Sequence, residues 1–159
     1  MRHVAGCALL LLLLAAGCTT GGPTLDEAAG VLAKDAKVLE RFHPSANKKV
    51  VDNTGKDHDD FASCSNKDTA LRYYQVSGDF AESSRSSSVQ RADSFALPLR
   101  DELQRAGYEL DRGASWVEPG RSIAILRKKD PGITFIVLVQ GSQPNVEIVG
   151  KTDCLPGRQ

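Results

Sequence analysis

The sequence has no charge excess, few aromatic residues and no long apolar segment. Its 159 residues contain 20 Lys and Arg against 20 Asp and Glu, and only 6% are aromatic. A nucleic-acid-binding protein usually carries a basic excess, and a polytopic membrane protein needs several apolar runs of about 20 residues. A disordered chain would have fewer apolar residues than the 41% found here, or more net charge. The sequence therefore indicates one small globular domain.

The first 17 residues have the pattern of a signal peptide. Arg2 and His3 give a positively charged start, and Val4 to Ala16 follow as an apolar run of 13 residues. This length suits the apolar core of a signal peptide and is too short to span a bilayer. A helix packed in the mature fold would keep one polar face, and this segment has none. We therefore expect residues 1–17 to be a signal peptide.

The segment Ala15-Ala16-Gly17-Cys18 at the end of this run resembles the lipobox of bacterial lipoproteins. The resemblance implies cleavage after Gly17 and attachment of a diacylglyceryl group to Cys18. Ala15 stands where that family most often has leucine. The alternative is ordinary secretory cleavage after an Ala-x-Ala-like site.

Residues 18–24 are expected to form a short tether. Removal of residues 1–17 takes away Arg2 and leaves 19 basic and 20 acidic residues, so electrostatic attraction to anionic lipid is small. Stable attachment would then need two or more acyl chains. The six residues after Cys18 reach only about 20 Å when extended. The expected location is the extracytoplasmic face of the cell membrane, with membrane lipid bound through the acylated Cys18.

Two cysteines remain once the leader and the lipobox are set aside. Cys7 lies in the leader and Cys18 in the lipobox, which leaves Cys64 and Cys154. In an exported chain these two most simply pair in a disulfide bond, which would close a loop of about 90 residues and contribute about 4 kcal/mol. A reactive thiol or a metal-binding pair is the alternative, although neither has a Cys-x-x-Cys and only His58 lies nearby.

Periodicity predicts two helices and several strands in residues 25–159. Thr24 and Glu27 form a capping box at the start of the first helix. Pro98 is expected to kink or restart the second helix, and Gly107 to end it. The predicted helices cover 25–42 and 89–106, and the predicted strands cover 49–52, 71–80, 108–117, 123–128, 133–139 and 146–152.

This order predicts one α+β domain over residues 25–159. We expect a twisted antiparallel sheet of about four to five strands, with two main helices packed on one face. Residues 133–139 are apolar on both faces except at Thr134, which predicts a central strand covered on both sides. The layout resembles the small lipoproteins of high-GC Gram-positive bacteria, which are largely of unassigned function. That resemblance implies a location and a fold.

The densest set of chemically active side chains is Asp57-His58-Asp59-Asp60. Adjacent residues on an extended segment point in opposite directions, so few of these groups could converge on a metal ion. We therefore expect a solvated loop, no metal and no other cofactor. The chain has no Gly-x-Ser-x-Gly elbow, and nothing in the spacing of its acids singles out a catalytic pair. A membrane-anchored hydrolase using His58 and an acid of this loop remains the alternative function.

Tyr73, Tyr108 and Trp116 are the candidates for a ligand cleft between the sheet and a helix. The alternative for each is packing in the core or on the sheet surface. The predicted function is a non-catalytic binding or envelope-interaction module. Its partner would be an unidentified envelope protein or a small ligand, and not nucleic acid.

Overall fold

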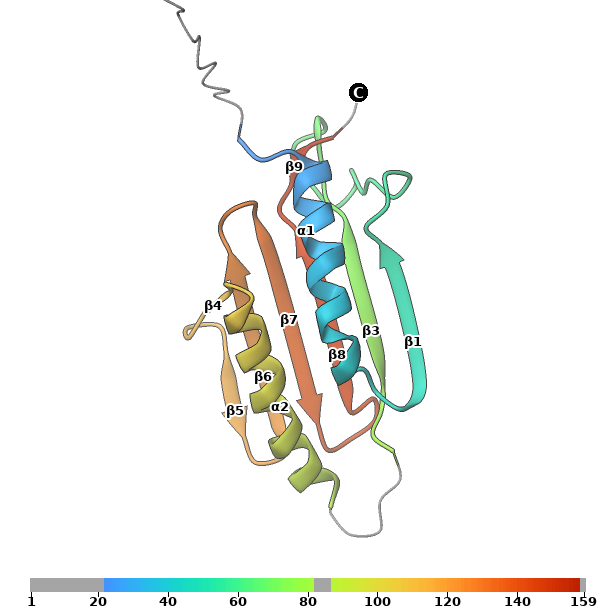
Figure 1. Cartoon of the computed structure of the whole chain (residues 1–159), viewed down its shortest axis with the longest axis vertical. Coiled ribbons are helices and arrows are strands. Elements are labelled where there is room, and N and C mark those ends of the chain that lie inside the picture. The colour runs from blue at the N-terminus through green and yellow to red at the C-terminus, as the bar shows by residue number, and fades with distance from the viewer. Residues whose placement is uncertain (1–21, 82–86, 158–159) are drawn as a thin grey trace, which may run out of the picture.

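The computed structural model describes residues 22–81 and 87–157, so the predicted signal peptide, Cys18 and most of the predicted tether lie outside the described residues. The described chain has the α+β architecture expected from the sequence (Figure 1). Its elements are α1 (Leu25–Val38), a 3-10 helix (Leu39–Phe42), β1 (Ala46–Asn53), β2 (Thr69–Ala70), β3 (Tyr73–Asp79), α2 (Ser88–Arg105), β4 (Glu109–Leu110), β5 (Trp116–Glu118), β6 (Arg121–Lys128), β7 (Ile133–Gln140), β8 (Val146–Thr152) and β9 (Leu155–Pro156).

The main sheet has seven antiparallel strands, more than the four to five expected. Its order is β1-β3-β8-β7-β6-β4, and β5 also pairs with β6. The predicted strand over 108–117 is in fact two short strands, because Asp111 interrupts it with a turn. The Asp111 carboxylate accepts hydrogen bonds from the backbone N–H groups of Gly113 and Ala114 at 3.2 and 3.1 Å. The last three predicted strands, over 123–128, 133–139 and 146–152, are present as β6, β7 and β8, which pair antiparallel in this order.

Both helices begin at capping boxes. Thr24 and Glu27 cap α1, as predicted, and Ser87 caps α2 by accepting from the backbone N–H of Gln90. Pro98 lies inside α2, which continues through it without a restart. Pro98 is exposed, so water can reach the backbone carbonyl group that proline leaves without a donor.

Both helices pack on the same face of the sheet, where α1 contacts β3 and β8 and α2 contacts β6 and β7 (Figure 1). The burial of β7 alternates accordingly: Phe135 and Val137 are buried under the helices, whereas Ile136 and Leu138 are only half-buried. The prediction that residues 133–139 are covered on both sides was therefore wrong. No described helix covers the second face.

The close approach of α1 to the sheet depends on Gly150 in β8. A Cβ atom at this position would lie 2.5 Å from the Phe135 ring and 2.7 Å from the Leu32 side chain. Both neighbours are fully buried, so they have little room to move aside. Glycine at this position lets the helix and the aromatic ring of β7 meet directly over the strand.

Candidate functional site

An apolar pocket lies on the helix-covered side of the sheet, between α2, β5 and β6. Its volume is about 180 Å³. We call it the α2–β6 pocket. Most of its wall is aliphatic, and its lining residues are Ala96, Leu97, Arg100, Leu110, Ser115, Val117, Ser122, Ile123, Ala124 and Val137.

Small side chains at helix–sheet contact positions create the space for this pocket. Ala96 lies on α2, and Ser122 and Ala124 occupy helix-facing positions of β6, since their partners on β7 are the buried Val139 and Val137. Larger side chains at these three positions would extend into the gap between the layers. An apolar ligand in this gap would gain dispersion contacts with the aliphatic side chains around it.

The rim of the pocket is apolar and exposed. Leu97 and Val117 are 52% and 72% exposed, which is unusual for large aliphatic side chains beside a cavity. Arg100 is the one charged residue that the described part of the chain contributes to the lining, and its guanidinium group contacts the neighbouring Asp101 at 3.2 Å. The pocket can therefore hold an apolar group beside this cation.

The wall of the pocket contains two serine residues, Ser115 and Ser122. The Ser115 hydroxyl accepts a hydrogen bond from the backbone N–H of Ile125 at 2.9 Å. This bond joins the segment before β5 to β6. Ser122 lines the pocket, and its hydroxyl has no partner among the described residues. Within the described residues, the lining contains no histidine, cysteine or carboxylate.

The structure does not bring the three predicted cleft aromatics together. Trp116 pairs with Ile123, which places its side chain on the sheet face opposite the helices, and the Arg121 guanidinium lies over its ring at 5.0 Å. Tyr73 lies on the same uncovered face, but on β3, with β8, β7 and β6 in between. The pocket nevertheless lies beside the Trp116 strand, because the next residue, Val117, forms part of its wall.

Tyr108 belongs to the core. Its side chain is 3% exposed, and its hydroxyl donates a hydrogen bond to the Asp35 carboxylate at 2.8 Å. Burial, together with the Asp35 charge, raises the pKa of Tyr108 far above its usual value. Lys128 donates to the same carboxylate oxygen and lies over the Tyr108 ring at 4.4 Å. This cluster joins α1 to β6 and leaves no room for a ligand.

The acidic segment 57–60 is tied into the loop before β2 and the start of β3. The Asp59 carboxylate accepts from the Arg72 side chain at 2.6 Å, and Asp60 accepts from the hydroxyl and the backbone N–H of Ser63. His58 is exposed. Among the described residues, no group of three or more His, Cys, Asp or Glu side chains could hold a metal ion.

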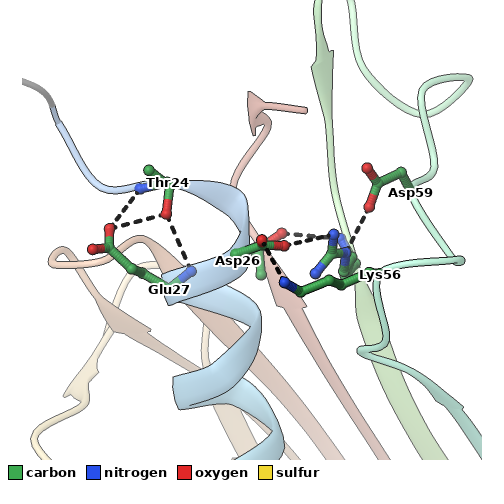
Figure 2. A network of polar contacts seen from close by, with 7 residues as sticks. Thr24, Asp26, Glu27, Lys56 and Asp59 are labelled. Atoms are coloured by element: carbon green, nitrogen blue, oxygen red, sulfur yellow. Dashed lines mark hydrogen bonds and ion pairs between the residues drawn. The ribbon is translucent and has the colours of Figure 1, made fainter. Parts of the chain in front are cut away.

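Arg72 is the centre of a buried ion-pair network at one end of the sheet. Its side chain is only 2% exposed and contacts the carboxylates of Asp26 at 3.0 Å and Asp59 at 2.6 Å. Asp26 also forms an ion pair with Lys56, and Figure 2 shows this pair beside the capping box of Thr24 and Glu27. The network joins the start of α1 to the long polar loop and to β3.

The predicted disulfide bond between Cys64 and Cys154 is present. It joins residues 90 positions apart, with a Cα–Cα distance of 5.8 Å. Beside it, Thr69 in β2 pairs with Pro156 in β9. The bond and this short ladder tie the polar loop to the C-terminal segment.

Comparison with family models, curated proteins and solved structures finds no match for this chain. Within residues 22–81 and 87–157, no helix is long and apolar enough to cross a membrane.

Proposed function

We propose that this protein is a membrane-anchored, extracytoplasmic lipoprotein that acts as a non-catalytic binding module, with the α2–β6 pocket as its binding site. The anchor proposal rests on the lipobox-like segment ending at Cys18. The disulfide bond between Cys64 and Cys154 supports an oxidising location outside the cytoplasm.

The observation that carries the binding proposal is a mostly apolar cavity whose lining includes two exposed aliphatic side chains, Leu97 and Val117. A cavity of about 150 Å³ lined by apolar side chains is known to take up benzene. The volume of about 180 Å³ found here therefore suits one aromatic ring or a short aliphatic body. It is smaller than the cavities of about 300 Å³ or more that hold drug-sized ligands.

Toluene should bind in this pocket and shift the NMR signals of its lining methyl groups. We expect saturable shifts concentrated in lining residues such as Leu97, Val117 and Val137, because the lining methyl groups would lie nearest the bound ring. Ser122→Phe should abolish the shifts, because a phenyl group at this helix-facing position would fill the cavity. Titration of the isotope-labelled mature protein measures both.

Ser77→Phe is the matched control, because Ser77 is also a half-buried serine on a strand but faces away from the helices. This variant should bind toluene as the wild type does. Toluene shifts that are absent from the wild type, or that persist unchanged in Ser122→Phe, would remove the pocket as a binding site.

A further inference from the structure

Arg100 gives the α2–β6 pocket a cation whose existing ion pair is poorly formed. It contacts Asp101 through two nitrogen atoms that share one carboxylate oxygen, at 3.4 and 3.2 Å. Charge-assisted hydrogen bonds are normally about 2.7–2.9 Å long. Adjacent residues on a helix do not face each other, which explains the long contacts.

Two other arginines of this protein form shorter ion pairs than Arg100 does. Arg105 contacts Glu102, three residues away on the same helix, at 2.6 Å. Arg72 is buried and contacts two carboxylates. The side chains of Arg100 and Asp101 are 31% and 52% exposed, so their pair contributes little and can be exchanged at small cost.

We propose that the ligand of this pocket is a small carboxylate with an apolar body, held at the opening by Arg100. This inference rests on the proposed binding function and names the ligand class. The guanidinium group has a planar arrangement of N–H donors that matches the two oxygen atoms of a carboxylate. A ligand carboxylate would therefore replace the long contact to Asp101 with two parallel hydrogen bonds. The apolar body fills the cavity between Ala96, Ala124 and Val137.

The Ser122 hydroxyl also favours an oxygen-bearing ligand over a pure hydrocarbon. It lines an otherwise aliphatic wall, and none of the described residues bonds to it. A hydrocarbon would cover this hydroxyl without replacing its hydrogen bonds to water, at a cost in affinity. A ligand with an oxygen atom can supply a partner.

Phenylacetate and phenylacetamide form the matched pair of probes, because they share one shape and differ in charge. Calorimetric titration of the wild-type mature protein should show that phenylacetate binds about tenfold more tightly, because a carboxylate forms stronger hydrogen bonds with the guanidinium group than a neutral amide oxygen does. Arg100→Gln should remove this preference, so that the two probes bind with about equal affinity. Glutamine is about as good a helix former as arginine, so the variant should keep the fold.

Arg105→Gln on the same helix is the control and should keep the tenfold preference, since Arg105 lies outside the pocket lining. Equal affinity of the wild type for both probes, or a preference that survives Arg100→Gln, would overturn the carboxylate inference. Binding of the neutral probe would show that the pocket itself is sound. Failure of both probes and of toluene would instead overturn the proposed binding function.

Discussion

Replacing Arg72 with methionine is expected to lower the free energy of unfolding by about 3 kcal/mol. Removing one partner of a buried ion pair costs about 3–5 kcal/mol, because the remaining charge is left buried and uncompensated. The lower end applies here, since the side chains of Asp26 and Asp59 are 31% and 12% exposed and keep some contact with water. The loss also removes the contact that joins the start of α1 to the residue before β3.

Urea unfolding followed by circular dichroism measures this effect. Arg127→Met is the matched control, because Arg127 is 56% exposed and makes one contact with Asp111 at 3.3 Å. Its loss should cost less than about 1 kcal/mol. Adding Asp26→Asn and Asp59→Asn to Arg72→Met should recover part of the stability, because no buried charge is then unpaired. Equal losses for Arg72→Met and Arg127→Met would show that the network contributes nothing.

Loss of the disulfide bond is the second large effect. Combining Cys64→Ser with Cys154→Ser should lower stability by about 2–5 kcal/mol while the fold is kept. The bond spans 90 residues, so in the chain-entropy model it strongly restricts the unfolded chain. It also holds the polar loop and the C-terminal segment, which are the parts most prone to fray.

Urea titrations of the oxidised wild type, the reduced wild type and the double variant test this prediction. Reduced wild type and double variant should unfold at the same lower urea concentration, because both lack the same covalent link. An oxidised wild type that unfolds together with the double variant would contradict the stabilising role. Two alkylatable thiols in protein kept oxidised throughout would contradict the bond itself.

Local features of the fold were predictable from the sequence because their causes lie within a few residues. The capping box of Thr24 and Glu27 depends on side chains next to the backbone groups that they satisfy. Gly107 ends α2 with a φ of 91°, a conformation that glycine adopts without strain.

Tertiary features were harder to predict, because they depend on segments that are distant in the sequence. The apolar residues Ile136 and Leu138 suggested a strand covered on both faces, but α1 and α2 both lie on the other face. Asp111 divides residues 108–117 through hydrogen bonds that alternation of apolar residues does not reveal. Pro98 could remain within α2 because its side of the helix faces solvent.

The binding site shows the same limit. The sequence predicted a cleft lined by aromatic residues such as Tyr73 and Trp116. The pocket is instead created by the small side chains of Ala96, Ser122 and Ala124. Ala96 belongs to the apolar stripe of α2, but the gap opposite it depends on the register of β6. The burial of Arg72 likewise needs both Asp26 and Asp59, which lie far apart in the sequence.

Intact mass spectrometry of unreduced protein from the membrane fraction tests the lipid-anchor proposal most directly. The proposal predicts a chain that begins at Cys18, carries a diacylglyceryl group and has no alkylatable thiol, because Cys64 and Cys154 are paired. Cys18→Ala should lack the lipid and leave the detergent phase. A wild-type chain without lipid, or one that partitions as Cys18→Ala does, would contradict the proposal.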